Sequence, residues 1–220
     1  MRKKLARRHI MSNPEQHPRI LDWHNVPEEE FFLYARAFRA AAKKMALAVE
    51  FGPGPSTKFA ACPVVFMYRH ALELHLQALI LGGGRNFLAT KPDRMSVYKT
   101  QSVSWLAQFV CQIVTTLNWE KEFRCEGIET LADFKAFVED VNSVDPGPYS
   151  FRYPASTEAQ DSVENNSTFS VREFGRRMDA LLELLDSTAD ALAATWDTQA
   201  EAAALDAALY AGTDIEPTIQ

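Results

Sequence analysis

The sequence predicts an all-α protein: a helical bundle of about five main helices, with a long irregular loop before the last long helix. Three observations favour this class. Apolar residues recur every three or four positions, glycine and proline gather in a few short clusters, and only the segment 149–154 alternates as a strand would. The chain has 220 residues and is 47% hydrophobic, so it is long enough to bury a core.

The first helix is predicted to start at Asn25, the expected cap, with Pro27 in its first turn and Glu28 closing a capping box. Its apolar residues follow a narrow seam, which stops before the Gly-Pro cluster at 52–55 and consists of Phe31, Ala35, Phe38, Ala42, Met45 and Val49. This pattern is typical of a helix that buries one face.

The second helix is expected from about Ala60 to Leu81, because three consecutive glycines follow it and supply a left-handed cap. Residues 82–100 are predicted to form a loop. The third helix is expected to be central in the bundle, because it is strongly apolar, with Trp105, Leu106, Phe109, Val110, Ile113, Val114 and Leu117.

The fourth helix is predicted to start near Thr130, with Asp133 at the capping-box position, and to end before the Pro-Gly cluster at 145–148. The last long helix is predicted to start at Ser170, which forms a capping box with Glu173. Phe169 and Phe174 stand where a hydrophobic staple is expected, and the apolar seam then continues to Trp196.

Charge divides the chain into three expected regions: a basic, flexible arm at 1–24, a helical domain at 25–197 and an acidic, Ala-rich tail at 198–220. Five basic residues and no acid lie within the first eleven positions, whereas nine acidic residues and no lysine or arginine follow Arg177. The arm is expected to be an unfolded leader, the alternative being a contact with nucleic acid or a membrane surface. The acidic end argues against non-specific binding of nucleic acid over the surface that it covers.

Several classes of protein are not expected from this sequence. No apolar run approaches the length of a membrane span and no signal peptide is recognisable, so a cytoplasmic protein without membrane contact is predicted. Cys62, Cys111 and Cys125 are widely spaced, which predicts neither a disulfide framework nor a zinc site. We expect no metal and no cofactor.

The second predicted helix carries a polar stripe on an otherwise apolar segment: Arg69, His70, Glu73 and Gln77. At 100° per residue these side chains share one face. Two interpretations stay open. The stripe is either an ordinary surface Arg–Glu pair beside a histidine, or a buried polar network in which Glu73 anchors a distant arginine.

His75 points to the apolar side of the same helix, together with Tyr68, Leu72 and Leu79. A core histidine satisfied by hydrogen bonding is the favoured interpretation, and a catalytic base is the alternative. Arg152 and Tyr153 belong to Phe-Arg-Tyr-Pro in the long loop. Arg152 is expected to pin this loop to an acid such as Glu73, the alternative being that it binds an anionic ligand.

Two motifs carry a resemblance to a known family: the run from Tyr68 to Leu79 and the later Asp-Pro-Gly…Phe-Arg-Tyr-Pro. Together they resemble divergent bacterial members of the HEPN superfamily over roughly residues 30–190. The resemblance implies a helical bundle that is often dimeric. Many of these proteins are metal-independent ribonucleases of toxin or phage-defence systems, with a signature of Arg, four to six residues, and His. That spacing occurs here from Arg69 to His75 and from Arg19 to His24.

The histidines depart from the family pattern, because all five lie at or before position 75 whereas the signature lies on a later helix. Gln101 and Ser102 also replace the usual His-Asp pair. The favoured function is therefore a non-catalytic, HEPN-like interaction module with a homo-oligomer or a protein partner. One alternative is a metal-independent ribonuclease acting on RNA, with Arg69 and His75 as catalytic candidates. A second is a protein that binds a nucleotide or another anionic ligand.

Overall fold

The computed structural model describes residues 30–51, 57–82, 84–144 and 170–211, and within these ranges the chain is mostly helical and contains no strand. The prediction of an all-α bundle is confirmed. In chain order the elements are α1 (Glu30–Phe51), α2 (Thr57–Leu81), the short 3₁₀ helix η1 (Gly84–Phe87), α3 (Arg94–Lys99), α4 (Val103–Thr116), α5 (Leu131–Val144) and α6 (Val171–Ala211).

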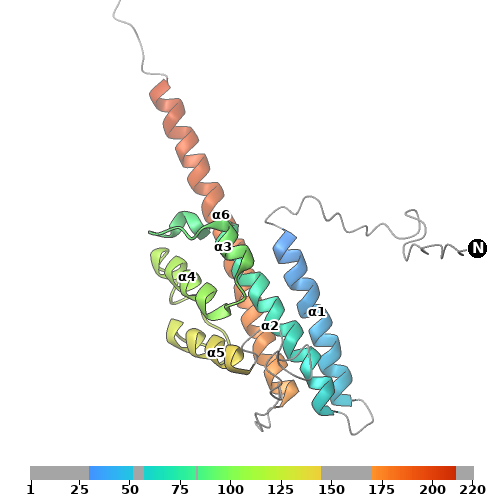
Figure 1. The fold of residues 1–220 in the computed structure, drawn as a ribbon. Helices are drawn as coiled ribbons and strands as arrows, with labels where there is room; N and C mark the ends of the chain where they lie inside the picture. Colours follow the sequence, from blue (N-terminus) through green and yellow to red (C-terminus); the bar gives the residue numbers. More distant parts are fainter. Residues whose placement is uncertain (1–29, 52–56, 83, 145–169, 212–220) are drawn as a thin grey trace, which may run out of the picture.

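The three long helices α1, α2 and α6 lie side by side and contact one another (Figure 1). On the side of α2 and α6 opposite to α1 lie α4, which contacts α2, and α5, which packs on α4. The sequence predicts α4 as the central helix, but the centre belongs to α2, which also contacts α3 and η1. An amphipathic helix buries one face against its neighbours. α2 is apolar on several faces, and it therefore packs against several other helices.

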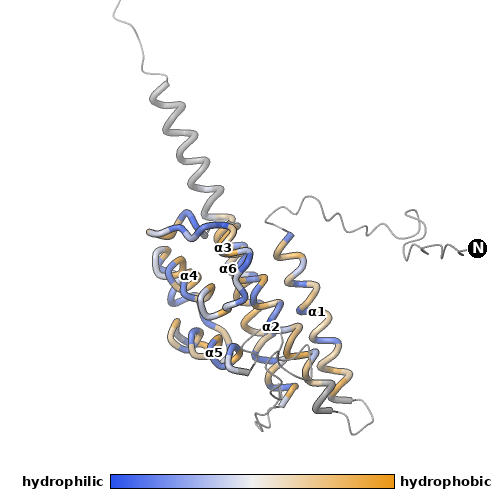
Figure 2. Tube along the Cα trace, in the orientation of Figure 1, coloured by the Kyte–Doolittle hydropathy of each residue, from blue (hydrophilic) through white to orange (hydrophobic). Residues whose placement is uncertain are grey.

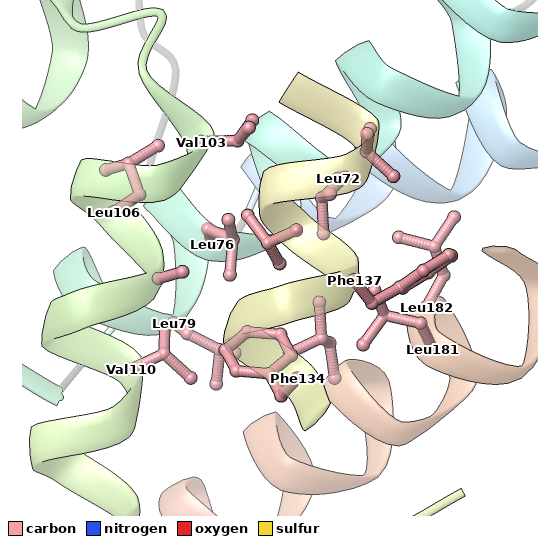
Figure 3. Close-up of a cluster of buried hydrophobic side chains, with 14 of the residues drawn as sticks. Leu72, Leu76, Leu79, Val103, Leu106, Val110, Phe134, Phe137, Leu181 and Leu182 are labelled. Carbon is pink, nitrogen blue, oxygen red and sulfur yellow. The ribbon is translucent and has the colours of Figure 1, made fainter. Parts of the chain in front are cut away.

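One continuous core joins the four helices α2, α4, α5 and α6. Figure 3 shows its side chains pointing toward one another: Leu72, Leu76, Leu79, Val103, Leu106, Val110, Phe134, Phe137, Leu181 and Leu182. All ten are at most 5% exposed. Because each large apolar side chain contributes roughly 1.5–3 kcal/mol when fully buried, this core is the main source of stability.

The predicted loop at 82–100 contains two short helices, which is a correction to the sequence interpretation. Asp93 caps α3, since its carboxylate accepts a hydrogen bond from the backbone N–H of Ser96 at 2.9 Å. Short helices lack the repeated apolar periodicity that a sequence pattern needs, so a cap of this kind is their main signal. α2 ends at Leu81 as predicted, and the N–H of Gly82 donates to the carbonyl of Ala78 at 2.7 Å. Neither Gly82 nor Gly84 has a positive φ, so neither supplies the predicted left-handed cap, and Gly83 lies outside the described residues.

The capping box predicted for the fourth helix is present at the start of α5. The backbone N–H of Asp133 donates to Oγ1 of Thr130 at 3.1 Å, and the N–H of Thr130 donates back to the carboxylate of Asp133 at 2.9 Å. The hydrogen bond from the Thr130 hydroxyl is the main cause that holds the pKa of Asp133 below its ordinary value. The box satisfies two N–H groups that the first turn would otherwise leave unpaired.

α6 starts where the sequence predicts but continues much farther. Ser170 accepts a hydrogen bond from the N–H of Glu173 at 3.3 Å, and the carboxylate of Glu173 binds Arg176 at 2.7 Å. The helix reaches Ala211, past the boundary predicted at 197, and its last part projects beyond the bundle (Figure 1). Alanine has the highest helix propensity, which favours this extension.

Other predicted features lie outside the described residues. These are the cap of the first helix at Asn25, the staple residue Phe169, and the loop that contains Arg152 and Tyr153. In the part of the chain that the structure describes, no helix is long and apolar enough to cross a membrane.

Candidate functional site

Three of the four side chains in the polar stripe of α2 are buried, and His70 is partly exposed. Arg69 is 3% exposed and Glu73 is 8% exposed, and Nη1 of Arg69 lies 3.1 Å from Oε2 of Glu73. The second terminal nitrogen of Arg69 donates to the backbone carbonyl of Gln101 at 2.7 Å. A buried charge is tolerated when it is paired and hydrogen-bonded, and both conditions are met here. The stripe is thus a network inside the bundle and not a pair on its surface.

Gln77 extends this network by one turn of α2. Its side-chain amide donates to the carbonyl oxygens of Val97 at 2.9 Å and of Thr100 at 3.3 Å. Together with the contact from Arg69 to Gln101, these hydrogen bonds fasten the connection between α3 and α4 to α2. The carbonyls at 97, 100 and 101 are peptide groups near helix ends, where backbone acceptors otherwise lack partners.

His70 lies beside Glu73 and between two aromatic rings. Nδ1 of His70 is 3.9 Å from Oε1 of Glu73, a distance for an ion pair when the imidazole is protonated but long for a hydrogen bond. The imidazole is parallel to the ring of Phe66 with ring centroids 5.9 Å apart, and nearly perpendicular to the ring of Phe38 with centroids 4.5 Å apart. Aromatic packing therefore orients His70 at this end of the network.

His75 belongs to a different environment, between α1 and α6. It is fully buried, its Nδ1 lies 2.8 Å from the carbonyl oxygen of Ala71, and its Nε2 lies 3.3 Å from Oδ1 of Asp186. Both oxygens are acceptors, so a ring nitrogen that carries a proton donates to the oxygen beside it. His75 has the hydrogen-bonded core position that the favoured sequence interpretation predicts.

Asp186 connects His75 to α1. Oδ1 of Asp186 accepts from Nε of Arg36 at 2.9 Å, and its other oxygen is 3.6 Å from Arg39. Burial by itself would raise the pKa of Asp186, but hydrogen bonds and charge from His75 and Arg36 outweigh it, so the pKa lies below its ordinary value. Asp186 is therefore the ionised centre of this contact.

Charged side chains form a ladder between α1 and α6, and sequence reasoning missed it. Besides the contact from Arg36 to Asp186, Arg39 donates to Asp179 at 3.1 Å and to Glu183 at 3.0 Å, and Lys43 lies 3.3 Å from Asp179. Burial by itself would lower the pKa of Arg39, but the hydrogen bonds to Glu183 and Asp179 outweigh it and raise the pKa above its ordinary value.

The signal for this ladder is present in the sequence as two heptad-like spacings. The basic residues of α1 stand at 36, 39 and 43, and the acidic residues of α6 stand at 179, 183 and 186. Each set occupies one face of its helix over two turns. Only the tertiary structure identifies the two faces as partners, because they are more than 130 residues apart in the chain.

Tyr68 of α2 contacts the ladder at Asp179. It is 1% exposed, and burial, followed by the charge of Asp179 and a hydrogen bond to it, raises the pKa of its hydroxyl. Gly175 of α6 faces this ring, since a Cβ built there would lie 3.4 Å from the Tyr68 side chain. An added methyl group at this position would therefore touch the ring at about van der Waals distance.

Arg69 and His75, the two catalytic candidates, are directed to different neighbours. Arg69 binds Glu73 and the connection between α3 and α4, whereas His75 binds Asp186 on α6. Catalysis of RNA cleavage would need an acid–base group and a charge-stabilising group directed at one phosphate. Within one chain the structure does not bring these two residues together at a common site.

The charged side chains described above form hydrogen bonds and ion pairs with other parts of the same protein, so they hold helices and the α3–α4 connection together. Comparison of the chain with family models, with curated proteins and with solved structures finds no match. The functional argument therefore depends on the geometry described above and on the surface of α1.

Proposed function

We propose that this protein is a non-catalytic, HEPN-like helical interaction module that self-associates through the outer face of α1. The observation that supports it most is an apolar line on this face. Leu33 is 62% exposed and Leu47 is 51% exposed, and they are two of the three large hydrophobic side chains that are exposed in the described part of the chain. Ala40 is exposed midway between them.

The spacing of these residues fits a second copy of the same helix. Leu33, Ala40 and Leu47 are seven residues apart, so they lie nearly on one line along α1. An antiparallel pair of α1 helices with a two-fold axis at Ala40 places Leu33 of one copy against Leu47 of the other, twice. Such a surface is self-complementary, which a two-fold symmetric interface requires.

The residues around this line are compatible with close packing. Ala37 is exposed beside Ala40, and small side chains let two helices approach each other. Lys44 borders the line, and its aliphatic stem can cover apolar surface while its ammonium group stays in water. On the inner face of α1, Ala35 and Ala42 are already buried, so the outer face is the one left for a partner.

The buried contacts favour a non-catalytic protein. Arg69, Glu73 and His75 are occupied by interactions that hold the α3–α4 connection and α6 in place. A residue whose hydrogen bonds maintain the fold must give them up before it can act on a substrate. This argues for the structural interpretation over the ribonuclease alternative.

Sedimentation equilibrium tests self-association directly. Four half-exposed leucines make a small contact compared with stable interfaces, so we expect a weak dimer with a Kd of roughly 10 µM or higher. The double variant Leu33→Lys/Leu47→Lys should be monomeric at every concentration. Met95→Lys, which alters the third exposed hydrophobic residue but lies off this face, is the matched control and should still dimerise.

A disulfide crosslink between the two copies tests whether the two-fold axis of the proposed dimer passes near Ala40. Ala40→Cys should form a disulfide-linked dimer under mild oxidation, whereas Ala136→Cys on the exposed side of α5 should not exceed the background of the unaltered protein. A protein that stays monomeric at several hundred micromolar contradicts the proposal. Cleavage of end-labelled RNA in chelator, lost in both Arg69→Ala and His75→Ala, would replace it with the ribonuclease alternative.

A further inference from the structure

The ladder between α1 and α6 shows that these two helices run antiparallel in a constant register. Its steps include the contacts of Arg36 with Asp186, of Arg39 with Glu183 and of Lys43 with Asp179. Along α1, hydrophilic residues alternate with hydrophobic ones (Figure 2). α1 begins at Glu30, six residues before Arg36, and this level corresponds to Leu192, six residues after Asp186. The described basic residues of α1 therefore face only the part of α6 that precedes Leu192.

α6 continues well past the start of α1. Leu192 is 2% exposed and belongs to the core, whereas the helix reaches Ala211 and its last part projects beyond the bundle. Figure 1 shows no other described element beside this projecting part. At 1.5 Å per residue the projecting part is about 28 Å long. Most helical stability in proteins comes from packing against other elements, so this part of α6 needs a partner.

The acidic face of α6 extends from the ladder into the projecting part. Asp190 is exposed, and no described residue forms an ion pair with it. Asp197 and Glu201 follow, and at 100° per residue all three positions lie within about 60° of Asp186 around the helix axis. Like charges four residues apart destabilise a helix, and no lysine or arginine follows Arg177 in the sequence. A basic partner for this face therefore has to come from outside α6.

The chain that leads into α1 is the most basic part of the sequence. Residues 1–24 contain six lysines or arginines and two acids. They precede the end of α1 that lies where α6 leaves the bundle (Figure 1). Arg19 is eleven residues before Glu30, and an extended chain of that length spans about 36 Å, more than the projecting part of α6. The basic residues can therefore reach every turn of the acidic face.

We propose that the basic segment, residues 1–24, binds along the acidic face that Asp190, Asp197 and Glu201 form on α6 of the same chain. The contact continues the pattern of the ladder, in which basic residues that precede α2 pair with acids of α6. Residues 28–30 are glutamates, so the pairing residues are those farther upstream. Exposed ion pairs are individually weak, so the contact depends on several of them and weakens as salt screens the charges. It does not involve the outer face of α1 and does not depend on self-association.

Limited proteolysis of the full chain tests the contact. Trypsin cuts after the lysines and arginines of the basic segment, and a bound segment is cut slowly because it must detach before it enters the protease. In low salt, the variant Asp190→Asn/Asp197→Asn/Glu201→Gln should lose the segment at least about five-fold faster than the unaltered protein does. Sodium chloride at about 0.5 M should bring the unaltered protein to the rate of the variant.

A matched control removes the same charge from another part of the surface. Glu120→Gln/Glu122→Gln/Asp140→Asn alters three exposed acids, two after α4 and one on α5, and it should be cut as slowly as the unaltered protein. Mass spectrometry identifies the positions at which the basic segment is cut. Equal rates for the unaltered protein and the α6 variant overturn the proposal.

Crosslinking of the unaltered protein distinguishes binding within one chain from binding to a second copy. A carbodiimide joins a lysine amine to a carboxylate that contacts it, and Lys3 and Lys4 are the lysines of the basic segment. In an equal mixture of ¹⁴N and ¹⁵N chains, these lysines should be linked to an acid at position 190, 197 or 201 of the same chain. Links between a ¹⁴N chain and a ¹⁵N chain, or no links to α6, overturn the proposal.

Discussion

Arg69 shows how one residue can carry a long-range contact inside a helical bundle. Its guanidinium binds Glu73 one turn away and the carbonyl of Gln101 beyond α3. The pair is almost fully shielded, with side-chain exposures of 4% for Arg69 and 10% for Glu73. The contribution of such an i,i+4 pair to the free energy of unfolding depends on whether the pair is buried, since an exposed pair contributes only about 0.3–0.5 kcal/mol.

Removing the carboxylate of Glu73 should destabilise the protein strongly. Glu73→Ala leaves the charge of Arg69 without its carboxylate partner in a buried position, so we expect a loss of about 3 kcal/mol in the free energy of unfolding. Urea denaturation followed by circular dichroism measures it. Glu122→Ala, an exposed glutamate, should change stability by less than about 0.5 kcal/mol. Equal midpoints for the two variants would refute the buried network.

At the scale of elements, two glycines have opposite roles that only packing reveals. Gly84 lies against the backbone of α2 and the side chain of Ile113, with 2.5 Å contacts for any added Cβ. Gly175 lies inside α6, where an added Cβ would make a tolerable 3.4 Å contact with Tyr68. The sequence places Gly84 after a helix and Gly175 within one, but it does not show how much room there is at either position.

Alanine substitutions at these positions should therefore have opposite signs. Gly84→Ala should destabilise the protein by about 1–3 kcal/mol, because η1 must move off α2 and α4. Gly175→Ala should stabilise it by about 0.5–1 kcal/mol through its higher helix propensity. Denaturation midpoints of the two variants provide the comparison. A loss of stability in Gly175→Ala would mean that the contact with Tyr68 has no room for a methyl group.

For the whole molecule, the ladder between α1 and α6 joins the three long helices through Asp186 and His75. The acidic set of α6 faces the basic set of α1, and α2 contributes the buried imidazole. Since the pKa of Asp186 is lowered in the folded protein, its ionised form stabilises the fold. The pH dependence of stability should report this contact.

The sign follows from the lowered pKa. Asp186 contributes its full stabilisation above the ordinary pKa of aspartate, about 3.9, and loses it as the pH falls below that value. Asp186→Asn should thus be less stable than the unaltered protein at pH 6, and the difference should shrink progressively below about pH 4. Urea titrations from pH 2.5 to 7 test this. A constant difference over the whole range would show that Asp186 acts through shape and not charge.

Local sequence signals account for much of the fold. The capping box at Thr130 and Asp133, the glycine stop after Leu81 and the long apolar seams each depend on neighbours within a few residues, and the structure has all of them. The short helix α3 was missed because six residues cannot show a helical period. On α2 the sequence indicates a polar stripe and the pairing of Arg69 with Glu73, but it does not indicate the backbone carbonyls at 97, 100 and 101 that Arg69 and Gln77 bind.

The class of fold, the starts of α5 and α6, the end of α2 and the polar face of α2 follow from local periodicity and capping, whereas the end of α6 was predicted too early. The tertiary structure alone decided that Arg69 is buried, that His75 faces α6, and that Arg36, Arg39 and Lys43 meet acids on α6. The reason is physical: the cost of a charge depends on its solvent exposure and on its partners, and both are set by helices distant in the chain.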